Sequence, residues 1–71
     1  MSEFKISMAA ARVNAKMNQQ EMANALGIDR TSYIRYEKGE SFMRMDMANT
    51  FSEIVGIPFT YIDFCSPKNT N

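Results

Sequence analysis

The chain has 71 residues, about half of one typical domain, which excludes a two-domain enzyme and leaves room for one small compact unit. Its 45% hydrophobic content is ordinary for a folded protein, and eight basic against eight acidic side chains give a net charge of zero, which argues against a polycation that coats nucleic acid or anionic lipid. One cysteine and no histidine exclude an internal disulfide and a Cys/His zinc site.

The first helix is predicted over residues 7–16. Apolar residues recur there at the spacing of one helix face, at Ile6, Ala10, Val13 and Met17, and Ser7 is a suitable N-cap. These four apolar side chains are therefore expected to face the core.

A second helix is predicted to begin after Asn18. Glu21 stands three residues beyond that cap, as in a capping box, and Met17 and Met22 have the spacing of a hydrophobic staple. The helix should end at Gly27, because glycine adopts the left-handed conformation of a helix C-terminus most easily.

A third helix follows almost immediately, with Asp29 as its cap and Gly39 beyond its last turn. Two helices joined through a glycine by so few residues cannot lie antiparallel and must turn sharply. The sequence therefore predicts a helix-turn-helix over about residues 18–39.

A fourth helix is expected to start, without a clear cap, between Met43 and Met45 and to stop at Gly56, with Met47, Phe51 and Ile54 on one face. Pro58 then suits the first turn of a brief fifth helix over 59–64. The predicted class is thus all-α, with four to five short helices in a domain over residues 1–64 and a flexible polar tail over 65–71. Cys65 in that tail is interpreted as an incidental free thiol.

The third helix has two chemically different faces. At 100° per residue Tyr33, Tyr36 and Glu37 point inward, and the opposite stripe consists of Arg30, Thr31, Ile34, Arg35 and Lys38. Arginine can bond guanine bidentately, threonine can bond a base or a phosphate, and isoleucine can touch a thymine methyl group. The alternative is a solvated stripe with one stray isoleucine.

Residues 19–39, QQEMANALGIDRTSYIRYEKG, resemble the small phage-repressor and Cro-like helix-turn-helix regulators of the XRE family, and the resemblance extends over residues 6–64. The shared pattern is a glutamine, a small alanine, the turn glycine and a closing Glu-Lys-Gly. The resemblance implies a lambda-repressor-like domain that binds double-stranded DNA through its third helix.

The resemblance also implies roles for single residues. Gln19 would hold a DNA phosphate, Arg12 would form a structural ion pair with Glu37, and the major groove would receive Arg30, Thr31, Ile34 and Arg35. Asp29 matches a position that sometimes touches bases, although capping alone explains it.

The sequence departs from the family in two places. Tyr33 stands where isoleucine or valine is usual, so its hydroxyl needs a partner. The loop after Gly39 carries few basic residues, which leaves Arg44 as its only candidate for a phosphate contact, beside Lys38 at the end of the third helix.

Catalysis has no support in the sequence, which lacks nucleophile motifs, a phosphate-binding glycine loop and metal-ligand spacing. No cofactor, metal or small-molecule ligand is expected. Without a run of about 18 apolar residues or a signal peptide, neither a membrane partner nor export is expected, and a cytoplasmic setting is the default.

The leading hypothesis is a sequence-specific repressor or Cro-type switch protein at a palindromic operator, with a homodimer on DNA. The alternative is a protein-interaction module of the same fold, such as an anti-repressor or an antitoxin.

Core packing is expected for Met17, Met22 and Met47. Closing of the core and a dimer contact both remain open for the aromatic run Phe59, Tyr61, Ile62 and Phe64.

Overall fold

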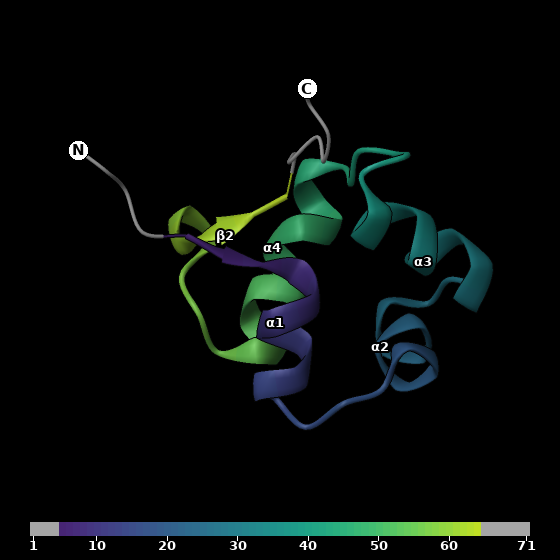
Figure 1. The fold of residues 1–71 in the computed structure, drawn as a ribbon, viewed down its shortest axis with the longest axis horizontal. Coiled ribbons are helices and arrows are strands. Elements are labelled where there is room, and N and C mark those ends of the chain that lie inside the picture. The colour runs from purple at the N-terminus through teal and green to yellow at the C-terminus, as the bar shows by residue number, and fades with distance from the viewer. Residues whose placement is uncertain (1–4, 65–71) are drawn as a thin grey trace.

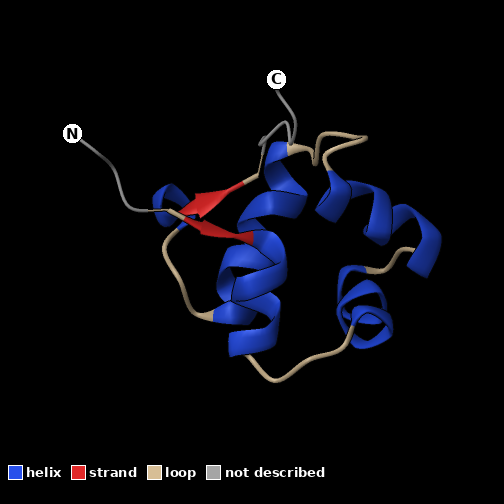
Figure 2. Ribbon diagram, viewed as in Figure 1, coloured by secondary structure: helices blue, strands red, loops and turns tan. Residues whose placement is uncertain are grey.

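The computed structural model describes residues 5–64, which form a small helical domain with one pair of very short strands (Figures 1 and 2). In chain order the elements are β1 (Ile6–Ser7), α1 (Met8–Asn14), α2 (Gln19–Leu26), α3 (Arg30–Lys38), α4 (Met45–Val55), the 3₁₀ turn η1 (Phe59–Tyr61) and β2 (Ile62–Asp63). The predicted all-α class is confirmed. The predicted tail with Cys65, and residues 1–4 of the predicted domain, lie outside the described residues.

The local signals around α2 act as predicted. The Asn18 side chain accepts a hydrogen bond from the Glu21 amide at 2.7 Å, and the Glu21 carboxylate accepts one from the Asn18 amide at 2.8 Å. This reciprocal pair is the capping box. At the other end, Gly27 has a φ of 76°, which a residue with a Cβ rarely adopts.

The prediction for α1 is wrong in its end and in its buried face. The helix stops at Asn14, because Lys16 adopts a left-handed φ of 63° and Met17 donates its amide back to the Arg12 carbonyl at 3.2 Å. The buried residues are Met8 and Ala11, whereas Val13 is 61% exposed.

The predicted face was anchored on Ile6, and this residue lies in β1. Because a residue in a strand does not follow the periodicity of a helix, Ile6 does not mark the buried face of α1. The observed buried face is offset from the predicted one by about one residue. Met17 lies beyond the helix and is half-buried against the core.

The two strands pair in parallel, with Ile6 opposite Ile62 and Ser7 opposite Asp63. In Figure 1 they lie side by side, with α1 and α4 between them and the α2–α3 pair. The predicted fifth helix over 59–64 is therefore wrong. Only a 3₁₀ turn forms, because the chain continues from it as an extended strand beside β1.

The buried core draws on every helix and on β2, and consists of Met8, Ala11, Met22, Ala23, Tyr33, Phe51, Val55 and Ile62. Phe64 packs edge-to-face on Phe51 with ring centroids 5.7 Å apart, and Phe59 lies 5.1 Å from Phe64. Within the described chain these two members of the aromatic run, Phe59 and Phe64, thus help to close the core, whereas Tyr61 is exposed.

The start of α4 follows Arg44, which makes no side-chain cap, as the sequence indicated. Its buried side chains are Ala48, Phe51 and Val55, so the expected core position of Met47 is wrong: this methionine is half-buried and lines a surface pocket. In residues 5–64 no helix has the length and apolar character that crossing a membrane requires.

Candidate nucleic-acid interface

The helices α2 and α3 form the predicted sharp turn. Ile28 donates its amide to the Ala23 carbonyl at 3.0 Å, which closes the end of α2 immediately before the next cap. The Asp29 carboxylate then accepts from the Ser32 amide at 3.0 Å and from the Ser32 hydroxyl at 2.8 Å. These hydrogen bonds lower the pKa of Asp29, so the cap is charged at neutral pH.

The outward side of α3 is polar and accessible. Arg30, Thr31, Arg35 and Lys38 are exposed. Ile34, which the helical projection placed on the outward stripe, is half-buried rather than fully exposed. The Arg35 Nε atom lies 4.0 Å from the Glu40 carboxylate, and both side chains remain more than half exposed.

A pocket of about 350 Å³ joins the starts of α2 and α3. Its lining combines two guanidinium groups with three side-chain amides, from Arg12, Asn18, Gln19, Gln20 and Arg30. The capping box provides acceptors for the backbone N–H groups of Asn18 and Glu21. The backbone N–H groups of Gln19 and Gln20, which lie between them, have no hydrogen-bond partner among residues 5–64. The cationic Arg30 side chain, these N–H groups and the positive end of the helix dipole all favour an anion here, whereas the charge of Arg12 is paired with Glu37.

Beneath this pocket the Glu37 carboxylate is bound by donors from three elements. Arg12 Nε donates to Glu37 Oε2 at 2.6 Å, and the Gln19 amide donates to Oε1 at 3.1 Å. The Tyr33 hydroxyl donates to Oε2 at 2.5 Å. The Arg12 and Glu37 side chains are only 13% and 7% exposed, so the ion pair is nearly buried.

Arg12 also reaches the loop between α1 and α2, where its Nη1 donates to the Met17 carbonyl at 2.9 Å. Burial by itself would raise the pKa of Glu37, but the hydrogen bonds from Arg12, Tyr33 and Gln19 outweigh it and lower that pKa. Burial and the bond to Glu37 together raise the pKa of Tyr33 far above its usual value, so the hydroxyl keeps its proton.

Sequence reasoning left the partner of the Tyr33 hydroxyl open. A signal for it was present, because Tyr33 and Glu37 are four residues apart and both point inward on the helical projection. The structure makes this pair a direct hydrogen bond.

Acid is expected to weaken the fold through Glu37. Because the folded-state pKa of Glu37 lies below its ordinary value of 4.5, ionisation of this group stabilises the fold above that pH, and the stabilisation is lost as pH falls through the folded pKa. Urea midpoints measured from pH 7 down to pH 3 should therefore decrease. The pKa of the Asp29 cap is also lowered, so Asp29 adds to the loss of stability in acid. The difference between wild type and Glu37→Gln therefore measures the contribution of Glu37. Equal pH dependence of the urea midpoint in these two proteins would contradict this prediction.

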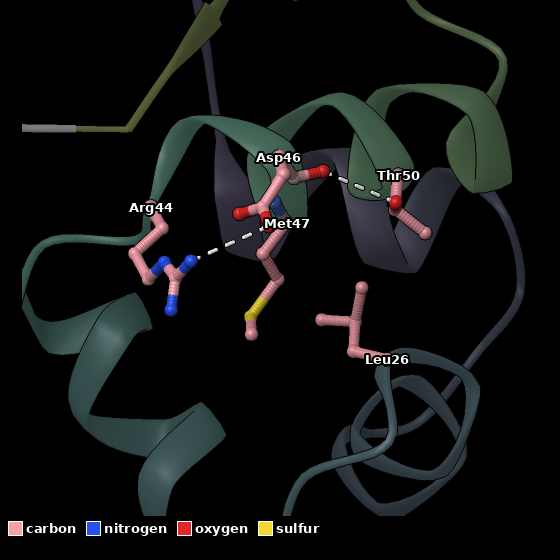
Figure 3. A pocket seen from close by; sticks show the side chains of 5 residues that line it. All are labelled: Leu26, Arg44, Asp46, Met47 and Thr50. Carbon is pink, nitrogen blue, oxygen red and sulfur yellow. Dashed lines mark hydrogen bonds and ion pairs between the residues drawn. The ribbon is translucent and has the colours of Figure 1, made fainter.

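Arg44 lies apart from these residues, at a second pocket of about 240 Å³ between the end of α2 and the first turns of α4. Figure 3 shows Arg44 beside Asp46, with Met47 and Leu26 facing the same space. The Arg44 Nη2 atom is 3.6 Å from the Asp46 carboxylate, and the Arg44 side chain is 79% exposed. The charge of Arg44 is thus partly offset by Asp46. No group of three or more metal-ligating side chains occurs in residues 5–64.

A family model described as a helix-turn-helix domain matches residues 8–62. Among curated proteins, the chain is similar to the cryptic phage CTXphi transcriptional repressor RstR of Vibrio cholerae, with 28% identity over 68 residues. The matched region covers 96% of this chain and 60% of that repressor, so the chain spans less than two thirds of its relative's length. No solved structure shows a significant match.

Proposed function

The chain belongs to the helix-turn-helix domain family of DNA-binding transcription regulators, and from this premise we propose that it is a sequence-specific repressor acting at a palindromic operator as a homodimer. The observation that carries the proposal is the exposed polar side of α3. Caps at Asn18 and Asp29 and the sharp turn at Gly27 fix the orientation of this helix relative to α2. The similarity to a phage transcriptional repressor supports repression as the outcome. No catalytic step is part of the proposal.

Four side chains of α3 are proposed to read bases: Arg30, Thr31, Ile34 and Arg35. The two arginines would bond guanine O6 and N7, and the partly exposed Ile34 would contact a thymine methyl group. Because the contact between Arg35 and Glu40 is long and exposed, Arg35 can turn toward a base at little cost.

Gln19, Lys38 and Arg44 are proposed to hold phosphates. Gln19 has the best support, because it lines a pocket together with the cationic Arg30, beside backbone N–H groups of α2 that have no partner among residues 5–64. Lys38 is exposed in the last turn of α3, and Arg44 is exposed before α4. Such contacts set the register of the protein on DNA and raise affinity for all sequences alike.

A homodimer would place two α3 helices in successive major grooves, about 34 Å apart. Met45, at the start of α4, is 65% exposed and is proposed to contact the second copy. Occupation of a promoter by such a dimer would block polymerase, and the concentration of the protein, competition for the operator or a partner protein would control it.

The proposal is tested by fluorescence anisotropy with DNA from upstream of the protein's own reading frame and with a scrambled duplex, at about 0.15 M salt where nonspecific attraction is screened. A preference of about a thousandfold or more is expected for the upstream DNA. Equal and weak binding to both duplexes would reject the proposal and favour a protein partner for the α3 surface.

Arg35→Ala is expected to relax the choice of base at one position of the operator by about 1–3 kcal/mol, because a bidentate contact to one base is lost. The measurement is the affinity for a set of operator duplexes that differ by single base pairs. Arg44→Ala is the matched control, since loss of a phosphate contact should weaken every duplex equally. Unchanged discrimination at all positions in Arg35→Ala would remove Arg35 from the base-reading set.

A further inference from the structure

Tyr33 has the largest of the fully buried side chains in the described part of the molecule, yet it carries a hydroxyl group. Phenylalanine would fill nearly the same space without a polar atom. A buried hydroxyl destabilises a core unless it is hydrogen-bonded, and this one donates to an ionised carboxylate, Glu37, at 2.5 Å. The hydroxyl therefore belongs to the polar network under the α2 N-terminus as well as to the core.

The two oxygen atoms of Glu37 have different partners. Oε2 accepts from the Tyr33 hydroxyl at 2.5 Å and from Arg12 Nε at 2.6 Å. Oε1 accepts from the Gln19 amide at 3.1 Å and only at 3.4 Å from Arg12 Nη2.

A symmetric pair of an arginine and a carboxylate would have two N–H···O contacts of about 2.7–2.9 Å. Here the pair is skewed. The tyrosine hydroxyl holds Oε2, and Oε1 is left available to Gln19.

We propose that the Tyr33 hydroxyl is a positioning element for DNA binding, which acts through Glu37 to hold the Gln19 amide in the orientation that meets a phosphate. This inference rests on the function proposed above. An ionised carboxylate only accepts hydrogen bonds, so Gln19 must turn its Nε2 toward Glu37. The second N–H of that amide then remains for a phosphate, in a side chain already ordered before DNA arrives.

The first test uses the free protein and is independent of DNA. The side-chain amide signals of Gln19 in a ¹H–¹⁵N spectrum, assigned by their loss in Gln19→Ala, should shift in Tyr33→Phe. Tyr61→Phe is the control, because Tyr61 is exposed, and it should leave these signals in place. Unmoved Gln19 signals in Tyr33→Phe would overturn the proposal, whatever the protein binds.

The second test measures DNA affinity in a double-mutant cycle of Tyr33→Phe and Gln19→Ala. Gln19→Ala should bind operator and scrambled duplexes about ten- to a hundredfold more weakly, which is the range for one hydrogen bond to a charged phosphate. Tyr33→Phe should show part of that loss, and both variants should keep the discrimination between the two duplexes. In the Gln19→Ala background, Tyr33→Phe should have no further effect. A structural role for the hydroxyl would instead give additive losses, and additive losses would reject the proposal.

Tyr33→Phe is expected to fold, because Arg12 and Gln19 still bind Glu37. Unfolding of this variant would show that the hydroxyl serves stability, and would also overturn the proposal. Gln19→Asn leaves the core unchanged, but its shorter side-chain amide cannot reach Glu37. We therefore expect it to bind DNA as weakly as Gln19→Ala does. Binding as tight as that of the wild-type protein would contradict the role of Glu37 in positioning Gln19. The Gln19 signals could shift in Tyr33→Phe while the wild-type protein binds operator and scrambled duplexes equally. In that case the proposed DNA-binding function is wrong, and so is the role of Tyr33 in DNA binding, although the link from Tyr33 to Gln19 holds.

Discussion

Replacing Arg12 by methionine is expected to destabilise the fold by about 3–5 kcal/mol, the range for breaking a buried ion pair on one side. Methionine keeps the unbranched apolar part of the side chain, but it removes the guanidinium group with its donors to Glu37 and to the Met17 carbonyl. The Glu37 carboxylate would then remain nearly buried with its charge uncompensated. For a chain of 71 residues this is a large share of the total stability. Urea unfolding followed by circular dichroism measures it.

Arg44→Met is the matched control for this substitution. Arg44 forms an ion pair with Asp46 at 3.6 Å, but both side chains are at least three-quarters exposed, so a change of about 0–1 kcal/mol is expected. Adding Glu37→Gln to Arg12→Met should restore part of the stability, because it removes the unpaired charge. Equal unfolding midpoints for Arg12→Met and Arg44→Met would show that the buried pair contributes little.

Phe51→Ala is expected to cost about 3–5 kcal/mol, as for other large-to-small changes at a buried aromatic residue. The Phe51 side chain is fully buried in α4 and meets Phe64 edge-to-face, so alanine would leave a cavity and remove one of the two aromatic partners of Phe64. The described chain is held mainly by this one small core, and neighbouring side chains can fill such a cavity only in part. The loss is measured as the shift of the urea midpoint at constant slope.

Phe42→Ala provides the comparison for the core substitution. Phe42 lies in the loop between α3 and α4 and is 68% exposed, so the same chemical change should alter stability by no more than about 0.5 kcal/mol. A loss in Phe42→Ala as large as that in Phe51→Ala would mean that this loop is part of the folded core, contrary to the burial described above.

The sequence predicted those parts of the candidate site that depend on neighbouring residues, namely the two helices α2 and α3 and the turn between them. The cap at Asn18 and the glycine at 27 act within one helical turn, so the bounds of α2 and α3 and the sharp turn between them follow from neighbouring residues alone. The Arg12–Glu37 pair was inferred only from the resemblance to a family, because the two residues are 25 positions apart and no local pattern joins them. The roles of the α3 side chains toward DNA remain predictions.

The sequence by itself determined where the helices begin and end wherever a cap or a glycine is present, since these signals depend on hydrogen bonds between near neighbours. Only the tertiary structure decided the rest. The pairing of Ile6 with Ile62 made the first segment a strand and thereby rotated the buried face of α1. The packing of α3 against α2, and the Arg12 side chain that extends to Glu37 from α1, gave the Tyr33 hydroxyl its place beside Arg12 and Gln19. Contacts between residues far apart in the chain carry no local periodicity, and they exist only once the core has closed.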